Sequence, residues 1–247
     1  MKDLNFLKDR LIAHRGMHNI KLGIPENSLK AFERAIEHNY IIELDLHVLK
    51  DNTVVVLHDD NLLRMTGVDK DLKDTTYEEI KELKLNNTEN HIPLFKEVLE
   101  LVDGRVPLVI EFKYDTKVGR LEEEAMKLLK DYKGKYVIKS FNPLTVNWFK
   151  KNYPDIIRGQ LGSSYEKIEV NGFLRLLLSH MFFNFITKPD FISYNIEFLP
   201  NKKVKKFRKT KPVLGWVIRN NEDLSKAKQY CDNYICENIE ELKIDNK

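Results

Sequence analysis

The chain has 247 residues, of which 42% are hydrophobic and 32% are charged, a composition typical of a globular protein and not of a disordered or fibrous one. Its 41 basic and 38 acidic residues leave a formal net charge of +3, too small by itself to indicate a nucleic-acid-binding protein. The length is close to the roughly 250 residues of one (β/α)8 barrel.

Strand-like and helical segments alternate along the whole chain. Eight segments have strand character: Leu11–Gly16, Ile41–Val48, Pro107–Tyr114, Lys135–Phe141, Ile156–Gly162, Phe191–Asn195, Val213–Ile218 and Tyr234–Cys236. Helices are expected between them, among them Asn27–Asn39, Pro93–Val102 and Tyr77–Leu83, the last preceded by a Thr76/Glu79 capping box. Because no linker or repeat divides the sequence, we predict a single α/β domain over residues 1–247, with a parallel sheet that is closed or open.

A β-hairpin interrupts this alternation between residues 44 and 59. Asp51-Asn52 suits a two-residue turn, because both residue types tolerate left-handed backbone geometry. Such a turn places Lys50 opposite Thr53, and counting outward then pairs Asp45 with His58. Cross-strand partners point to the same side of a hairpin, so we expect this carboxylate and this imidazole to be neighbours.

Carboxylates interrupt two strongly apolar strands. Glu43 and Asp45 are two residues apart and therefore share one face, and Glu111 and Lys113 repeat the pattern on a later strand. Buried charges are costly unless they are compensated, and three converging carboxylates would form an oxygen-ligand site for a divalent cation. The alternative is an internal ion pair of Lys113 with Glu43 or Asp45.

His14 favours the catalytic interpretation of these carboxylates. It ends another apolar strand, where the chain bends at Gly16, and Arg15 follows it directly. Together with His58 it provides two imidazoles, one to remove a proton from a nucleophile and one to protonate a leaving alcohol. A cation, Arg15 and Lys113 would neutralise phosphoryl charge, so the set predicts cleavage of a phosphodiester.

The ordered motifs around these residues resemble those of the glycerophosphodiester phosphodiesterase family. They are Ala13-His14-Arg15-Gly16, Pro25-Glu26-Asn27-Ser28, Glu43-Leu44-Asp45, His58-Asp59 and Glu111-Phe112-Lys113, with weaker similarity at Ser140-Phe141-Asn142 and Trp216. The resemblance implies a distorted TIM-type (β/α)8 barrel with the hairpin at its catalytic face. It also implies metal-dependent hydrolysis of glycerophosphodiesters to sn-glycerol 3-phosphate and an alcohol.

The resemblance also assigns roles to individual residues. His14 and His58 match the acid/base pair, and Glu43, Asp45 and Glu111 match the metal ligands. Phosphate-contacting positions are matched by Arg15 and Lys113, a polar position near the metal by Glu26, and a residue lining the substrate pocket by Trp216. An all-oxygen site suits Mg²⁺, Ca²⁺ or Mn²⁺, and which of them is native stays open.

The C-terminal region departs from the family pattern, so the alcohol headgroup stays open. Cys236-Glu237-Asn238 stands where the family usually has Thr-Asp or Thr-Asn, and Trp216 is followed by Val-Ile-Arg in place of the commoner Thr-Val-Asn. His47 shares a face with Asp45, and we expect it to pack on the hairpin and not to bind metal. The oligomeric state is not indicated by the sequence.

Two further segments are compatible with a lipid substrate, which therefore stays an alternative. Residues 173–186 are unusually apolar and are expected either to pack on the barrel or to form a dimer contact, a lid or a membrane contact. Residues 202–211 carry a run of lysines and arginine that could touch anionic lipid. Alternative functions are therefore a lysophospholipase D-like or phospholipase C-like hydrolase, and a non-catalytic phosphate- or lipid-binding barrel. No nucleic-acid partner is expected, because the basic run lacks interleaved aromatic residues apart from Phe207.

The location expected from the sequence is cytoplasmic, with peripheral membrane contact as an option. Residues 1–10 contain five charged residues and no apolar run of signal-peptide length. A run of about 18 consecutive apolar residues, as a spanning helix needs, occurs nowhere in the sequence. Cys231 and Cys236 match no metal or redox spacing and are interpreted as reduced thiols.

Overall fold

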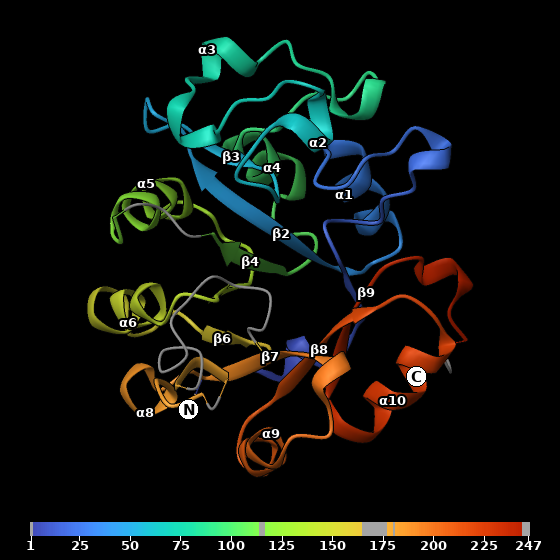
Figure 1. Cartoon of the computed structure of the whole chain (residues 1–247), viewed down its shortest axis with the longest axis vertical. Coiled ribbons are helices and arrows are strands. Elements are labelled where there is room, and N and C mark those ends of the chain that lie inside the picture. Colours follow the sequence, from blue (N-terminus) through green and yellow to red (C-terminus); the bar gives the residue numbers. More distant parts are fainter. Residues whose placement is uncertain (1, 114–116, 165–176, 180, 244–247) are drawn as a thin grey trace. The chain divides into compact units, whose positions relative to one another are not determined.

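The computed structural model describes residues 2–113, 117–164, 177–179 and 181–243 (Figure 1). The chain divides into two compact units. The first unit is Ile12–Tyr136, and the second unit combines Met1–Leu11 with Val137–Lys247. Each unit is described separately below.

The first unit is built around one long strand. Its strands and α-helices are β1 (Ile12–Ala13), α1 (Leu29–Glu37), β2 (Ile41–Val48), β3 (Val54–Val56), α2 (Leu63–Thr66), α3 (Tyr77–Ile80), α4 (Phe95–Val102), β4 (Leu108–Phe112) and α5 (Arg120–Leu129). Strand β2 is buried along its whole length and pairs in parallel with β1 and β4. In the register of β2 and β4, Asp45 lies beside Glu111.

Local sequence explains the helices next to these strands. The Ser28 side chain accepts a hydrogen bond from the Ala31 amide (3.2 Å) and so caps α1, which buries Ala31, Phe32 and Ala35. The Thr76/Glu79 capping box at α3 is confirmed. Helices α1, α3 and α4 begin and end within a few residues of the predicted bounds, which is the usual uncertainty at helix ends.

The hairpin is present, but the predicted pairing of Asp45 with His58 is wrong by one residue. Strand β3 runs antiparallel to β2 with Leu46 opposite Val56, and the backbone amide of Leu57 donates to the Asp45 carbonyl (3.2 Å). The reason is the loop, which has three residues because the Leu49 amide bonds the Thr53 carbonyl (2.9 Å) and Asn52 takes the left-handed conformation (φ 68°). His58 therefore lies beyond the end of β3.

The connection from β3 to α4 has a small apolar core of its own. Buried side chains from the hairpin and from the four short helical segments that follow pack together: Leu49, Val55, Leu57, Leu62, Met65, Leu72, Ile80, Leu85 and Ile92. We call this set the hairpin core. It fixes the backbone on both sides of His58, since Leu57 precedes that residue and Leu62 follows it.

The second unit contains five strands in a parallel sheet. Its strands and α-helices are β5 (Tyr136–Ser140), α6 (Pro143–Asn152), β6 (Arg158–Gly162), α8 (Asn184–Thr187), β7 (Phe191–Asn195), α9 (Lys202–Arg208), β8 (Val213–Ile218), α10 (Asn221–Tyr230) and β9 (Asn233–Cys236). Each strand pairs in parallel with the next, from β5 to β9. All strands predicted from the sequence in this unit are present, which confirms the alternation of strands and helices.

Candidate active site

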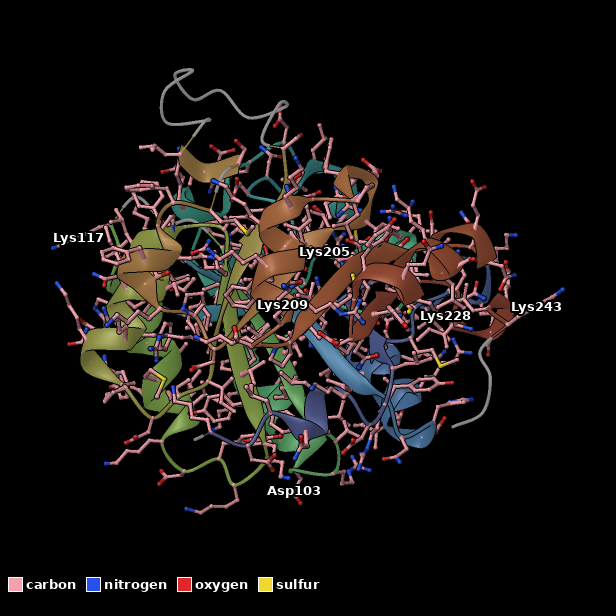
Figure 2. The ribbon with its side chains drawn as sticks, turned by 90° about the horizontal axis from the view of Figure 1, so that it is seen from below. Asp103, Lys117, Lys205, Lys209, Lys228 and Lys243 are labelled. Carbon is pink, nitrogen blue, oxygen red and sulfur yellow. The ribbon has the colours of Figure 1, made fainter. Side chains whose placement is uncertain are left out.

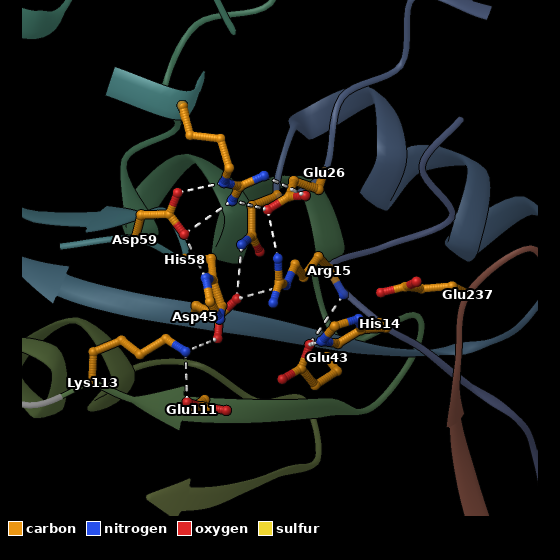
Figure 3. Close-up of polar contacts among 12 residues, drawn as sticks. His14, Arg15, Glu26, Glu43, Asp45, His58, Asp59, Glu111, Lys113 and Glu237 are labelled. Atoms are coloured by element: carbon orange, nitrogen blue, oxygen red, sulfur yellow. Dashed lines mark hydrogen bonds and ion pairs between the residues drawn. The ribbon is translucent and has the colours of Figure 1, made fainter. Parts of the chain in front are cut away.

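Three buried carboxylates come together in the first unit. Glu43 and Asp45 point to one face of β2, and Glu111 on β4 is the register partner of Asp45 (Figure 3). Each residue is at most 5% exposed, and each offers one oxygen within 4.8 Å of the other two. The predicted convergence of these carboxylates is therefore a feature of the structure.

Two cations contact this cluster. The Lys113 ammonium lies 2.9 Å from Asp45 Oδ1 and 2.7 Å from Glu111 Oε1, and Arg15 Nε lies 3.4 Å from Asp45 Oδ2. Burial would raise the pKa of Asp45, but Lys113 and Arg15 hold this pKa well below its usual range. Burial would likewise lower the pKa of Lys113, but Asp45 and Glu111 raise it. The ion pair of Lys113 with Asp45 thus exists together with the cluster and does not replace it.

His14 and Arg15 reach the cluster from a tight turn after β1. His14 Nε2 lies 4.0 Å from Glu43 Oε2, and the backbone amide of Arg15 donates to the same oxygen (3.0 Å). Arg15 (φ 56°) and Gly16 (φ 78°) are both left-handed, and a Cβ at Gly16 would lie 2.8 Å from the Ala31 carbonyl carbon. Glycine at this position lets the turn pack directly against α1.

His58 stands on the other side of Asp45. Its Nδ1 lies 2.7 Å from Asp59 Oδ1, and 35% of its side chain is exposed, so the ring is accessible to a ligand. Burial and then Lys113 lower the pKa of His58, and both favour the neutral imidazole. Both histidines are close enough to Asp45 to influence its carboxyl group.

Glu26 and Asn27 complete the polar shell. The Glu26 carboxylate binds Arg15 Nη1 (2.6 Å) and also contacts Arg64, while the Asn27 amide nitrogen donates to Asp45 Oδ2 (2.9 Å). Asn27 is fully buried with φ 54°, and its Oδ1 has no hydrogen-bond partner among the residues that the structure describes.

Sequence reasoning identified the motifs that contain Asn27 and Asp59 but assigned no site role to these residues, and it gave Arg64 only the role of tying down the hairpin. A positive φ at Asn27 and a contact of Arg64 with Glu26, 38 positions away, leave no local signal. His47 packs on the hairpin, as expected, with Nε2 3.3 Å from the His58 carbonyl and Nδ1 3.8 Å from Asp60 Oδ1. Burial lowers the pKa of His47.

Trp216 belongs to the second unit. It lies on β8, partly buried, with its ring edge-on to Phe141 at a centroid distance of 5.7 Å. Its predicted place in the substrate pocket stays a prediction. Cys231 and Cys236 are free, buried thiols of the same unit, and burial raises the pKa of Cys231 to about 12.

The donor set of the first unit fits a hard divalent cation. It consists of carboxylate oxygens from Glu43, Asp45 and Glu111, the ligand type that Mg²⁺ and Ca²⁺ prefer, and the unpartnered Asn27 Oδ1 lies in the shell around them. Five carboxylates (Glu26, Glu43, Asp45, Asp59, Glu111) face three permanent cations (Arg15, Arg64, Lys113), so the formal charge with neutral histidines is −2. A divalent cation would balance it.

Solved structures with the same architecture define the class of fold. A phosphodiesterase of Oleispira antarctica, solved with the product sn-glycerol-3-phosphate, superposes with a TM-score of 0.77 over 93% of both chains at 22% identity. A glycerophosphodiester phosphodiesterase of Thermotoga maritima gives a TM-score of 0.72 over 94% of this chain and 96% of its own, at 24% identity. The fold is that of the TIM-type (β/α)8 barrels, as predicted.

The family follows from the sequence comparison. Residues 14–237 match the glycerophosphoryl diester phosphodiesterase family, and the chain belongs to that family. A glycerophosphodiester phosphodiesterase of Caldanaerobacter subterraneus is 36% identical over 166 residues, covering 63% of this chain and 67% of that protein. A lysophospholipase D of Homo sapiens is 34% identical over 155 residues, covering 58% and 45%. The chain therefore spans about two thirds of the length of such bacterial relatives (63% to 67%) and under half of the human one.

Proposed function

We propose that the protein hydrolyses glycerophosphodiesters to sn-glycerol 3-phosphate and an alcohol. The observation that carries this proposal is the placement of two histidines, His14 and His58, around one carboxylate cluster that fits a divalent cation. Membership of the family and the product-bound structural neighbour support the choice of substrate.

The residues would divide the work as follows. Glu43, Asp45 and Glu111 hold a divalent cation, Mg²⁺ or Ca²⁺, which when bound neutralises charge on the phosphoryl oxygens. Arg15 and Lys113 provide further positive charge for the same oxygens, because both form ion pairs with Asp45 at the centre of the cluster.

The two imidazoles carry the protons. One accepts a proton from the attacking water and the other donates a proton to the oxygen of the departing alcohol. Because Nδ1 of His58 is bonded to Asp59 and the ring is partly exposed, Nε2 is the nitrogen available to substrate. Glu26 orients Arg15 through their 2.6 Å contact.

The test is release of glycerol 3-phosphate from glycerophosphocholine, with and without EDTA. We expect metal-dependent release by the wild type and a loss of at least about 10²-fold for His14→Ala and for His58→Ala, the usual contribution of one acid/base group. His38→Ala is the matched control, because His38 is exposed and contacts the Arg34 carbonyl away from the cluster. No release from any glycerophosphodiester with Mg²⁺ or Ca²⁺ would reject the proposal and favour a non-catalytic binding barrel.

A lipid substrate is the second candidate, supported by an apolar surface in the second unit. Near α6 and α8 large apolar side chains are exposed: Leu144 (65%), Phe182 (57%), Phe185 (83%) and Ile186 (47%). Of the apolar segment 173–186, residues 173–176 and 180 lie outside the described residues. Exposed aromatic side chains of this kind suit insertion into a lipid interface.

Basic residues accompany this surface within the same unit. The segment 202–211 forms α9 and the turn after it, and Figure 2 labels Lys205 and Lys209 there. Such charges would attract an anionic membrane. Among the described residues no helix has the length and apolar character that crossing a bilayer requires. The expected cytoplasmic location stays a prediction.

Sedimentation with vesicles containing phosphatidylserine tests this contact. We expect weak binding that falls with salt and is lost in a Phe182→Ser/Phe185→Ser variant, with Lys228→Gln, on α10, as the surface control. A wild type that stays in the supernatant on anionic vesicles would reject the membrane contact. Release of choline from lysophosphatidylcholine faster than from glycerophosphocholine would favour the lipid substrate.

A further inference from the structure

One exposed guanidinium joins two carboxylates of the candidate active site. Arg64 Nε and Nη2 donate to Asp59 Oδ2 and Oδ1 (2.5 and 3.1 Å), and its Nη2 and Nη1 donate to Glu26 Oε1 and Oε2 (2.7 and 3.1 Å). Both pairs are bidentate, the geometry in which arginine is most selective and least replaceable by lysine.

Each of these carboxylates also holds one residue to which we assign a catalytic or binding role. Asp59 Oδ1 lies 2.7 Å from His58 Nδ1, and Glu26 Oε1 lies 2.6 Å from Arg15 Nη1. These contacts connect the His58 imidazole, through Asp59, Arg64 and Glu26, to the Arg15 guanidinium, which lies beside Asp45. Nothing else among the described residues is shown to contact both carboxylates.

The backbone around Arg64 is held firmly although its side chain is 47% exposed. Leu62 and Met65, on either side of it, are buried in the hairpin core. The Leu63 amide is capped by Asn61 Oδ1 (2.8 Å), and Gly67 ends α2 in the left-handed conformation (φ 79°). The turn therefore presents Arg64 at a fixed place above the two carboxylates.

The contact with Asp59 has a chemical consequence for His58. A carboxylate bound to Nδ1 keeps the proton of a neutral imidazole on that nitrogen and leaves Nε2 free to exchange a proton with a ligand. Asp59 can do this only while it is ionised and correctly turned. Although burial opposes it, the hydrogen bonds from Arg64 and His58 lower the pKa of Asp59 to about 2, which keeps it ionised.

We propose that Arg64 is a positioning residue, which through Asp59 fixes the tautomer and orientation of His58 and through Glu26 fixes the orientation of Arg15. The part concerning catalysis rests on the proposed function, whereas the part concerning the tautomer does not. A single side chain then orients two of the groups to which the proposed function gives a role at the phosphate.

The competing explanation is that Arg64 merely ties the hairpin down. Arg120 provides the comparison, because it also ties the hairpin, donating from Nε to Asn52 Oδ1 (2.9 Å) and from Nη2 to the Leu49 carbonyl, and it contacts neither Asp59 nor Glu26 in the described contacts. Arg64→Gln and Arg120→Gln therefore each remove an arginine that binds the hairpin segment, and only the first removes contacts to Asp59 and Glu26.

The first readout is ¹⁵N NMR of histidine-labelled protein at pH 8, with His58 assigned by comparison with His58→Ala. We expect one tautomer in the wild type, protonated at Nδ1, and a mixture of the two tautomers in Arg64→Gln and in Asp59→Asn. Arg120→Gln should keep the wild-type spectrum. An unchanged tautomer in Arg64→Gln, or the same change in Arg120→Gln, would overturn the proposal.

The second readout is kinetic. We expect Arg64→Gln to lower kcat roughly 10- to 100-fold, as loss of an outer-shell partner does, and to raise KM, because Arg15 is released as well. Arg64→Lys should restore less than half of the loss, and millimolar guanidinium should partly rescue Arg64→Ala. A wild-type kcat and KM in Arg64→Gln would overturn the proposal. A wild type without activity would reject only the proposed function and leave the NMR test in force.

Discussion

The two units of this protein each contain a cluster of charged side chains with buried members, and the clusters differ in what their groups bind. In the second unit Arg158, the first residue of β6, donates to the carbonyls of Thr187, Pro154 and Lys188 (3.2–3.4 Å). Asp190 accepts from the Arg158 amide (3.1 Å) and from Lys2 Nζ (2.8 Å). The Arg158 guanidinium thus donates its hydrogen bonds to backbone carbonyls, and the Asp190 carboxylate accepts from a backbone amide and a lysine.

The cluster of the first unit differs in its net charge and in having a buried polar atom without a hydrogen-bond partner among the described residues. Acidic groups exceed permanent cations there, and the buried Asn27 Oδ1 has no hydrogen-bond partner in the described part of the chain. Glu111 also stands near the C-terminal end of its strand, where barrel enzymes carry their sites, whereas Arg158 stands at the N-terminal end of its strand. The comparison teaches that buried charge marks a site when the chain itself leaves part of the charge unbalanced.

The largest expected effect separates the clusters by activity. Asp45→Asn keeps the side-chain shape but removes the charge that Lys113 and Arg15 face, so we expect kcat/KM to fall by at least about 10³-fold, or about 4 kcal/mol. Asp190→Asn is the matched control and should keep kcat/KM. Equal losses in both variants would remove the distinction.

The second prediction concerns stability and the cluster of the second unit. Arg158→Met removes a buried guanidinium and leaves the carbonyls of Thr187, Pro154 and Lys188 without their donor, so we expect the free energy of unfolding to fall by about 3 kcal/mol in urea titrations, while kcat per folded molecule is unchanged. A variant as stable as the wild type would show that the second cluster is not structural.

Metal binding should stabilise one cluster only. Mg²⁺ or Ca²⁺ at about 100 times its Kd should stabilise the wild type by about 2.7 kcal/mol, seen as a higher Tm. In Glu43→Gln/Glu111→Gln, which lacks two of the three carboxylates, the increase should disappear. An increase of the same size in that variant would place the cation elsewhere, and none in the wild type would argue against a metal site.

The smallest expected effect is a pH dependence of stability. The pKa of Asp59 is about 2 in the folded chain, below the roughly 3.9 of an unfolded aspartate. A lowered pKa contributes stability above the unfolded value, and this stability is lost as the pH falls through the folded value. Because the carboxyl is partly exposed and screened, we expect a loss of roughly 1–2 kcal/mol between pH 5 and pH 2, absent in Asp59→Asn. Parallel stability curves for the two proteins would contradict this.

Much of the fold was predictable, because the length of an apolar run and the polar residues that bound it are enough to locate a buried strand. Ile41–Val48 was predicted with its observed bounds, since an apolar run between polar turns defines it on both sides. The convergence of Glu43, Asp45 and Glu111 follows from parallel pairing of two such strands. Whether the chain is one domain, as predicted from its sequence, stays a prediction.

The failures have a local cause. Asp51-Asn52 is compatible with a two- and a three-residue loop, and only the left-handed Asn52 decides between them, so the register was shifted by one residue. Arg64 lies on a four-residue helix and is exposed, features that favour a surface role. Its partner Glu26 is far away in the sequence, and no periodicity connects the two.

The contiguity of the acid–histidine set has a consequence for descent. Every member from His14 to Lys113 lies within the first 113 residues of the chain, whereas Trp216 and the departures at Cys236-Glu237-Asn238 lie downstream of them. A crossover placed after Lys113 would pass on the whole set intact while exchanging the downstream half. Recombination between relatives can therefore exchange the downstream half of the chain without having to rebuild the carboxylates and histidines of the cluster.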